Sequence, residues 1–278
     1  MKATRDVLHK LYIPGPPLSY FVENIWYYED NYAAYNRAKI LPDGAIELII
    51  DLDAWPKKLF DSELSTEKFQ VCKKFWISGE RTRYIVIGAD NTNMIGIRFR
   101  PGGAFPFFGF PISELNESVI DLDLIWGRMV HMLRDELLEI QSPEGRIHRF
   151  ETFLLEQARR SLEPNKAIAF AVQQLQHSPQ FLAIRDLANQ IGITQKHLIT
   201  QFEKVVGLRP KSFARVCKFR KVLNVIEERS RIEWTDIAYE CGYYDQAHFI
   251  KEFHTFSGLN PSTYLTSRGD YLGYIPID

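Results

Sequence analysis

The last third of the chain contains the same pattern of residues twice, about 50 residues apart. Each copy has an apolar residue and an alanine, a glycine, then an aromatic residue, a second glycine, a proline and another aromatic residue. The first copy is Leu187, Ala188, Gly192, Phe202, Gly207, Pro210 and Phe213, and the second is Ile237, Ala238, Gly242, Phe253, Gly258, Pro261 and Tyr264. All intervals agree except for one residue added between Gly242 and Phe253. The repeat predicts one helix-turn-helix unit used twice.

Each copy has the residues that two crossing helices need. The alanine allows a close crossing, and the glycine ends the first helix with a backbone of positive φ. Thr194 and Asp245 follow, with side-chain oxygens that can cap the second helix. Apolar residues three and four apart then form the faces that we expect to be buried, namely Leu198, Phe202 and Val205 in one copy and Phe249, Phe253 and Phe256 in the other.

The opposite faces of these second helices are predicted to read DNA bases. They carry Gln195, Lys196, Ile199 and Thr200 in the first copy, and Gln246, Ala247, Ile250 and Lys251 in the second. Glutamine can pair with an adenine edge, lysine with guanine, and an apolar side chain with the thymine methyl group. The alternative is that each residue is only part of a solvated helix face. For the surface as a whole we favour double-stranded DNA as the partner.

The segment between the two copies is strongly basic. From Arg209 to Lys221 it has six basic residues and no acidic one, interleaved with apolar residues. We expect Arg215 and Lys218 to contact phosphates there, with a solubilising face as the alternative. Whole-chain charge hides this signal, since 34 basic and 35 acidic residues give a net charge of -1. Residues 164–278 have 14 basic and 11 acidic residues, whereas residues 1–163 have 20 and 24.

These residues resemble the AraC/XylS family of transcriptional regulators over roughly residues 165 to 266. The resemblance rests on the two copies above together with Cys241-Gly242-Tyr243, Asp245 and His248-Phe249. It implies two helix-turn-helix units joined by a long helix, each placing its second helix in one of two successive major grooves. The family often has arginine where Thr200 and Lys251 stand, and threonine cannot make the bidentate contact of arginine with guanine.

The remainder of the chain predicts a second domain of a different class. Residues 1–163 contain short β-rich runs at 45–52, 75–79, 84–87 and 94–100, which suggest a small barrel or sandwich. Helical patterns follow from about 122 to 140 and from about 144 to 162, before Pro164 and Asn165 mark a hinge. The prediction is therefore an α+β chain: a β-rich sensor or dimerisation domain with linker helices at 1–163, and an all-α tandem DNA-binding domain at 164–278.

The family resemblance extends more weakly to the segment Leu41-Pro42-Asp43-Gly44 with Ile46-Glu47-Leu48, which looks like the start of a sensor domain. It implies a module that binds a small-molecule effector. Candidate ligand-binding residues are Trp26, Tyr28, Glu47, Trp76 and Arg98, although aromatic residues on strands are more often plain core. The alternative is a domain that only dimerises or binds a protein. RNA polymerase and a second copy of the chain stay open as partners.

An enzyme in the N-terminal region is the rival class of function. The region before residue 164 has only His9, His131 and His148 as histidines, all outside the β-rich runs, and it lacks a nucleophile elbow and a phosphate-binding glycine loop. Cys72 has no histidine near it in the sequence. We therefore expect no catalytic residue, metal or cofactor. No apolar run reaches membrane-span length and no signal peptide is evident, so we expect a cytoplasmic protein without membrane contact.

Overall fold

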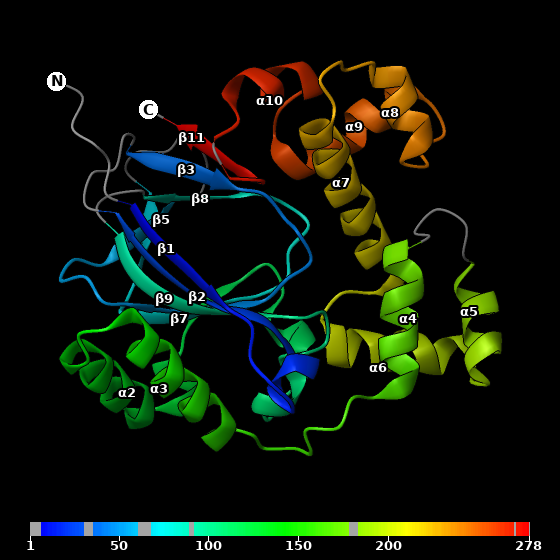
Figure 1. Cartoon of the computed structure of the whole chain (residues 1–278). Coiled ribbons are helices and arrows are strands. Elements are labelled where there is room, and N and C mark those ends of the chain that lie inside the picture. The colour runs from blue at the N-terminus through cyan, green and yellow to red at the C-terminus, as the bar shows by residue number, and fades with distance from the viewer. Residues whose placement is uncertain are drawn as a thin grey trace, which may run out of the picture.

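The computed structural model describes residues 7–30, 36–60, 68–88, 92–177, 183–269 and 271–277, with a β-rich N-terminal half and a helical C-terminal half (Figure 1). The N-terminal half has two antiparallel sheets, with strand orders β1-β2-β9-β4-β7-β10 and β11-β3-β8-β5-β6. The strands are β1 (Val7–Tyr12), β2 (Val22–Asp30), β3 (Arg37–Ile40), β4 (Glu47–Asp51), β5 (Lys57–Phe60), β6 (Phe69–Cys72), β7 (Phe75–Ser78), β8 (Ile85–Gly88), β9 (Thr92–Phe99), β10 (Val119–Asp121) and β11 (Tyr274–Ile277).

Strand β2 shows how the first sheet separates two environments. Ile25 and Tyr27 are buried with Ile97 of β9 in the core under the sheet. The alternate residue Trp26 points to the opposite face, where it borders a cavity between the two sheets. Its indole lies over Gly96, where a Cβ atom would come within 2.2 Å of the ring. Glycine at this position therefore makes room for the tryptophan.

Helices α1 (Asp123–Trp126), α2 (Arg128–Glu139) and α3 (Pro143–Glu156) cover the outer face of the first sheet (Figure 1). The sequence predicted one helix from about 122 to 140, but Gly127 interrupts it with a φ of 57°. Ser142 caps α3 by accepting a hydrogen bond from the backbone N–H of Gly145 at 3.2 Å. Apolar residues of α2 and α3 join the core of the first sheet. Short 3₁₀ turns η1 (Leu18–Tyr20), η2 (Phe105–Phe107) and η3 (Ile112–Leu115) complete this half.

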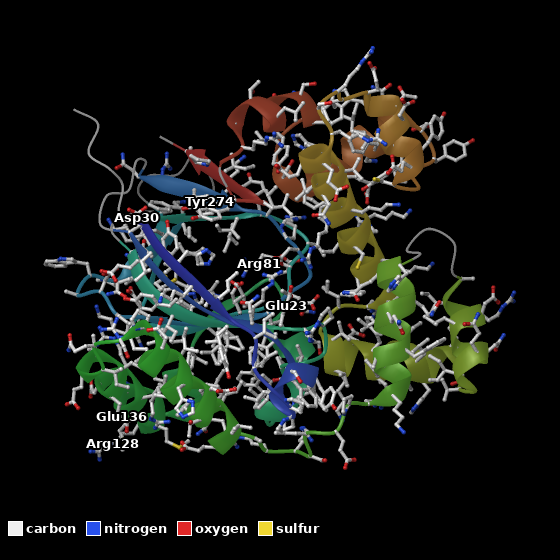
Figure 2. The ribbon with its side chains drawn as sticks, viewed as in Figure 1. Glu23, Asp30, Arg81, Arg128, Glu136 and Tyr274 are labelled. Carbon is white, nitrogen blue, oxygen red and sulfur yellow. The ribbon has the colours of Figure 1, made fainter. Side chains whose placement is uncertain are left out.

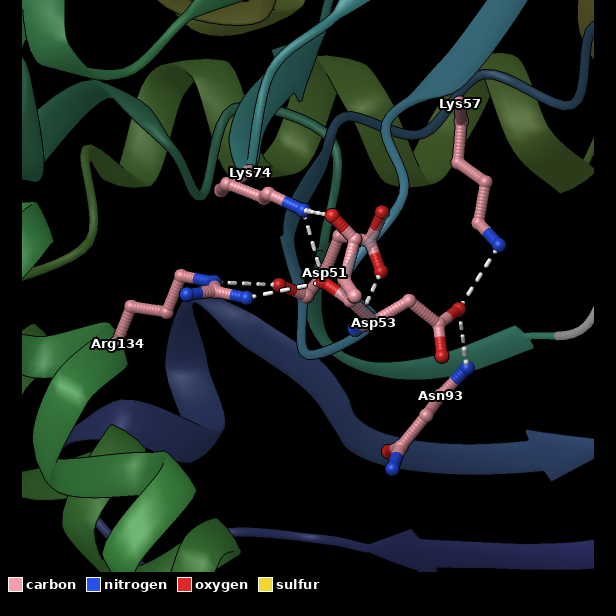
Figure 3. A network of polar contacts seen from close by, with 7 residues as sticks. Asp51, Asp53, Lys57, Lys74, Asn93 and Arg134 are labelled. Atoms are coloured by element: carbon pink, nitrogen blue, oxygen red, sulfur yellow. Dashed lines mark hydrogen bonds and ion pairs between the residues drawn. The ribbon is translucent and has the colours of Figure 1, made fainter.

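The turn after β4 is fixed by a polar network (Figure 3). Arg134 of α2 donates to the backbone carbonyls of Asp51 at 2.7 Å and Asp53 at 3.0 Å, and Lys74 donates to the Asp53 carbonyl at 2.8 Å. The Asp53 carboxylate accepts from the backbone N–H of Asn93 at 3.0 Å. Burial raises the pKa of Asp51 to about 6. The network holds α2 against the ends of β4, β7 and β9.

The C-terminal half contains the two predicted helix-turn-helix units. After α4 (Lys166–His177), the first unit is α5 (Ile184–Ile191) and α6 (Gln195–Val206); the long helix α7 (Pro210–Glu228) leads to α8 (Trp234–Glu240), α9 (Gln246–Ser257) and α10 (Pro261–Ser267). The apolar faces predicted for α6 and α9 are buried in one core with α7. Gly192 and Gly242 make the predicted turns, with φ of 81° and 79°. Within the residues described, no helix is long and apolar enough to cross a bilayer.

Beyond α10 the chain returns to the N-terminal half, where β11 pairs with β3 in an antiparallel register that puts Tyr274 opposite Ile40 (Figure 1). The backbone N–H of Leu41 also donates to the carbonyl of Gly273 at 2.8 Å. Ile275 is buried together with Leu41 in the core of the C-terminal half. Strand β11 is an addition to the predicted architecture, which had residues 164–278 as helical. Its position follows from a strand partner more than 230 residues away in the sequence.

Each helix-turn-helix unit has its own contact with the N-terminal half. In the first unit, Asn116 beyond η3 donates through Nδ2 to the carbonyl of Gly207 at 2.8 Å. In the second unit, the backbone N–H of Tyr84 donates to the carbonyl of Phe256 at 3.1 Å. We call these two contacts and the β3–β11 pairing the interdomain seam. The seam attaches both units to the same β-rich half.

Glu80 is buried where α7 meets the N-terminal half. Its side chain is 1% exposed, and neither carboxylate oxygen has a hydrogen-bond partner within the described part of the chain. Burial, and then the charge of Asp43, raises the pKa of Glu80 well above its ordinary value of 4.5. The Glu80 charge in turn adds to burial in raising the pKa of Cys217 on α7. Glu80 is an uncompensated acid near α7, and its protonated form is favoured.

We predict that Glu80→Gln raises the free energy of unfolding at pH 7.5 by about 1 to 3 kcal/mol. Because the pKa of Glu80 is higher in the folded chain than in the unfolded chain, the folded state binds more protons than the unfolded state between pH 4.5 and the raised pKa. The wild-type free energy of unfolding should therefore fall as pH rises through this window. Urea unfolding of both chains from pH 5 to pH 8 measures the difference. Exposed Glu114→Gln is the control, and equal pH slopes in wild type and Glu80→Gln would contradict the prediction.

Candidate nucleic-acid interface and ligand cavity

Helix α6 presents the first predicted reading surface. Thr194 caps it, because its hydroxyl accepts a hydrogen bond from the backbone N–H of His197 at 3.2 Å. The N-terminal turns are open to solvent, whereas the C-terminal end contacts η3 and the N-terminal half. The residues predicted to meet bases are exposed apart from the half-buried Ile199, and they are Gln195, Lys196, Ile199 and Thr200.

Helix α9 presents the second predicted reading surface. Its cap is Asp245, whose carboxylate accepts from the backbone N–H of His248 at 2.7 Å. Gln246 accepts a hydrogen bond from the hydroxyl of Thr235 on α8 at 3.2 Å, which orients its side-chain amide. All four predicted residues of this surface are exposed, namely Gln246, Ala247, Ile250 and Lys251. Both capped helices therefore offer a polar N-terminal half to solvent, with the backbone N–H groups of a helix N-terminus beside it.

The structure gives internal partners to both cations predicted to contact phosphates. Arg215 makes a two-pronged ion pair with Glu252 of α9, at 2.7 Å and 2.9 Å. Lys218 donates to the carbonyl of Gly242 in the turn of the second unit at 2.9 Å, and burial lowers its pKa. These contacts fix α9 and its turn to the linking helix α7. Sequence reasoning missed this role, because both partners lie more than 20 residues along the chain.

A basic cleft of about 530 Å³ lies between α5, α6 and α7. Arg185 and Lys211 line it together with Gln195 of the first reading surface, and Arg215 and Lys218 form its other side. Lys211 is exposed and makes no ion pair within the described residues. Arg185 escaped the sequence analysis, since it lies outside the basic run of α7. The cleft gathers cations beside the first reading helix, which suits an acidic backbone such as that of DNA.

A separate cavity of about 370 Å³ lies between the two sheets of the N-terminal half. Of the predicted ligand-binding residues, it brings together Trp26, Tyr28, Glu47 and Arg98. Trp76 is not part of the lining and lies in an adjacent small cluster with Cys72 and Met94, against which Trp26 packs. Residues that the sequence analysis did not single out also line the cavity, and they are His9, Leu11, Asn24, Ile87, Gly88, Thr92, Met94, Tyr271 and Tyr274. Figure 2 shows Tyr274 on β11 at the same end of this half as Asp30 of β2.

Arg98 connects the cavity to the segment before β4. Its side chain is 15% exposed and donates to Glu23 at 3.1 Å, to Glu47 at 3.0 Å and to Asp43. Asp43 precedes Gly44, whose Cα lies against Phe213 and Val216 of α7: a Cβ there would be 3.5 Å from both side chains. Asp43, which pairs with Arg98 beside the cavity, is therefore followed directly by a residue that lies against α7.

Cys72 and the other cysteines have poorly nucleophilic thiols. Burial raises the pKa of Cys72 to about 12, that of Cys217 to about 12 and that of Cys241 to about 11. A thiol must lose its proton to act as a nucleophile, so these values disfavour the enzyme alternative in which Cys72 is the nucleophile.

Comparison with known families supports the assignment of the helical half. A family model described as a helix-turn-helix domain matches residues 187–267, which span both units and α7. AarP, a transcriptional activator of Providencia stuartii, is 30% identical over 93 residues, covering 32% of this chain and 66% of AarP. YbfI of Bacillus subtilis, an uncharacterized HTH-type transcriptional regulator, is 26% identical over 152 residues, covering 52% of this chain and 53% of YbfI.

The helical half is a helix-turn-helix domain of the AraC/XylS type. The chain spans about half to two thirds of the length of these two relatives. Residues 10–121 match a second family model, described as a domain of unknown function (DUF6597). The match covers the two sheets up to β10, apart from β11 and the start of β1.

Among solved structures, ToxT from Vibrio cholerae aligns over 94% of this chain and 98% of its own, with a TM-score of 0.47 and 12% identity. The C-terminal domain of AraT from Geobacillus stearothermophilus covers 40% of this chain, with a TM-score of 0.35 and 21% identity.

We predict that Thr194→Ala and Asp245→Ala each lower the free energy of unfolding by about 1 kcal/mol, because each removes the side-chain oxygen that caps α6 or α9. Thr194→Ser and Asp245→Asn keep an acceptor at the same place and should stay close to wild type. Urea unfolding followed by circular dichroism measures all four variants. Alanine variants as stable as the serine and asparagine variants would show that these caps do not hold α6 and α9.

Proposed function

We propose that this regulator binds double-stranded DNA at specific sites, with one monomer reading two adjacent major grooves. In this proposal α6 enters one groove and α9 enters the next, with α7 between them. The bases are met by Gln195, Lys196, Ile199 and Thr200 from α6 and by Gln246, Ala247, Ile250 and Lys251 from α9. The observation that supports it best is the pair of capped helices that leave their polar N-terminal halves exposed.

The units follow each other head to tail, so the two half-sites of one monomer should not form a palindrome. Lys211 and Arg185 would contact phosphates beside the first groove. Arg215 and Lys218 would act mainly by holding the second unit on α7, through Glu252 and the turn carbonyl. Such a reader of bacterial DNA works in the cytoplasm, and this location is part of the proposal.

We further propose that the N-terminal half senses a small molecule. A cavity lined by aromatic and charged side chains favours this function over the alternative, in which the domain only dimerises or binds a protein. The cavity has walls from both sheets and from the segment after α10, so its occupant would contact the same tail that belongs to the second unit. An effector could then alter DNA binding through the interdomain seam.

The two-groove arrangement predicts a dependence on helical phase. The binding site is first obtained by selection from a random DNA pool, and about five base pairs are then inserted between its two parts. About five base pairs are half a helical turn, so the insertion puts the two half-sites on opposite faces of the DNA. Only one of α6 and α9 can then bind, and the affinity should fall about a hundredfold. Five base pairs added outside the site are the control. An affinity that survives the central insertion would contradict the two-groove proposal.

A comparison of Lys251→Ala with Lys211→Ala tests which cations read bases. Lys251→Ala should change the preference at one base-pair position by about 1 to 3 kcal/mol. Lys211→Ala should weaken binding to selected and random DNA alike, and reduce the slope of log affinity against log salt by about 1. Binding titrations on a panel of single-base variants at several salt concentrations measure both. Equal effects of the two variants on selected and random DNA would refute these roles.

A further inference from the structure

The charges around the N-terminal cavity are unbalanced. Arg98 is the only lysine or arginine among the described residues that line it, and its guanidinium already pairs with the carboxylates of Glu23, Asp43 and Glu47. These four side chains carry a formal excess of two negative charges, and Arg81, whose charge also acts on Asp43 and Glu47, reduces the excess to one. Burial raises the pKa of Glu47 despite the nearby Arg98, as expected where cationic compensation is incomplete.

The nearest lysine of the neighbouring strand β3 does not correct this balance. Lys39 points to the other side of the second sheet, where its ammonium lies 4.4 Å from the centre of the Tyr84 ring. It donates there to the carbonyl of Ser257 in the DNA-binding half at 3.4 Å. A cation that entered the cavity would therefore gain electrostatic energy, whereas an anion would be repelled.

Aromatic side chains from β1, β2 and the segment after α10 form one wall of the cavity. Tyr28 and Tyr271 meet edge to face with ring centres 6.4 Å apart, and His9 contacts each of them at 6.0 Å. Trp26 continues this wall along β2. The face of an aromatic ring attracts a cation, and several such rings around one site can hold an ammonium group. The wall thus combines apolar contact with a preference for positive charge.

One acceptor in the lining has no partner. The side-chain oxygen Oδ1 of Asn24 is buried and makes no hydrogen bond within the described part of the chain. Asn24 lies on the same face of β2 as Trp26, and it lines the cavity with Glu47. A ligand that brings N–H donors would satisfy this oxygen, since a buried acceptor without a partner costs about 1 to 3 kcal/mol.

We propose that the cavity binds a small organic cation: a primary ammonium or amidinium group on an apolar, preferably aromatic, body. The nitrogen would lie against Glu47 and Asn24, and the body would lie among Trp26, Tyr28 and Tyr271. This assignment rests on the proposed sensing function and specifies the chemical class of the effector. A carboxylate ligand would meet an excess of carboxylates and an arginine whose three nitrogen atoms already donate to acids.

The same geometry couples the cation to the DNA-binding half. Tyr271 and Tyr274 belong to the segment after α10, and Tyr274 is the first residue of β11. A ligand in contact with these tyrosines adds contacts that exist only while β11 is paired with β3. Binding should therefore strengthen this part of the interdomain seam and, through it, change the affinity for DNA by the reciprocal amount.

Three probes that share a phenylethyl body test the charge preference on the full chain: 2-phenylethylammonium, 2-phenylethanol and 3-phenylpropanoate. Isothermal titration calorimetry and thermal shift measure their binding. The ammonium should bind about tenfold more tightly than the alcohol, with the carboxylate weakest, because only the ammonium gains the ion pair and the aromatic contacts. Equal or tighter binding of the alcohol or the carboxylate, or no binding of the ammonium at 10 mM (roughly 10,000-fold above a micromolar Kd), would overturn the proposal.

Variants locate the site. Glu47→Gln should weaken the ammonium about tenfold and leave the alcohol unchanged, with exposed Glu114→Gln as the matched control. Tyr271→Ala is a second variant that leaves the ion pairs of Arg98 intact. Tyr271 is 45% exposed, so its removal should not unfold the chain. Tyr271→Ala should also weaken the ammonium, whereas Tyr271→Phe keeps the ring and should retain most of the affinity. Ammonium binding that is unaffected by both Glu47→Gln and Tyr271→Ala would place the site elsewhere and overturn the proposal.

DNA titrations with and without 2-phenylethylammonium separate this proposal from the proposed function. Ammonium binding that depends on Glu47, with DNA affinity unchanged, would support the cation site and count against sensing. Absence of ammonium binding in a chain that still binds its selected DNA would overturn the cation site and leave the DNA-binding function standing. A change of at least threefold in DNA affinity, lost in Glu47→Gln, would support both.

Discussion

The pairing of β11 with β3 is the constraint on which the arrangement of the two halves depends. It takes the residues that follow the last helix of the DNA-binding half and builds them into a sheet of the N-terminal half. Ile275 is buried in the helical core, while Tyr274, its neighbour, lines the cavity. Because side chains alternate across a strand, one short segment reaches both environments at once. The second unit and the cavity therefore share a structural element.

The first unit is attached independently, through Asn116 and the carbonyl of Gly207. Between the two attachments runs α7, which is buried against both units through residues such as Phe213 and Phe219. Phe219 stacks on Phe256 of α9 with ring centres 4.9 Å apart. The relative orientation of α6 and α9 is thus set by α7, which packs between the two units, and by the N-terminal half, which contacts each unit. Buried Glu80 adds a pH-sensitive cost near α7, since its ionised form has no partner among the described residues.

The sequence predicted best what depends on local chemistry. The turns at Gly192 and Gly242, the caps Thr194 and Asp245, and the buried faces of α6 and α9 follow from residue type and spacing within about 20 positions, and the structure confirms them. Where partners are distant, prediction was weaker. Neither the pairing of β11 nor the break of the 122–140 helix at Gly127 was predicted.

In the candidate sites, too, the sequence predicted what local patterns determine and missed what distant partners determine. The sequence predicted Trp26, Tyr28, Glu47 and Arg98 as ligand-binding residues. They meet in the cavity because β2, β9 and β4, which carry them, are neighbouring strands of the first sheet. The sequence did not name Tyr271, since no local pattern indicates that the chain end returns to the N-terminal half and adds β11 to the second sheet. The basic run of α7 was visible, yet charge alone does not show that Arg215 belongs to Glu252. For that reason the net charge of residues 164–278 overstates how many cations are free to meet phosphate.

Hydrogen–deuterium exchange of the full chain, free and bound to its selected DNA site, tests most directly whether the seam couples the two halves. In the proposed two-groove complex, α6 and α9 fit grooves one turn apart while each remains attached to the N-terminal half. We therefore predict that DNA changes amide exchange in β3, in β11 and at Tyr84, in addition to protecting α6 and α9. Protection of α6 and α9 with unchanged exchange at all three seam positions would contradict coupling through the seam.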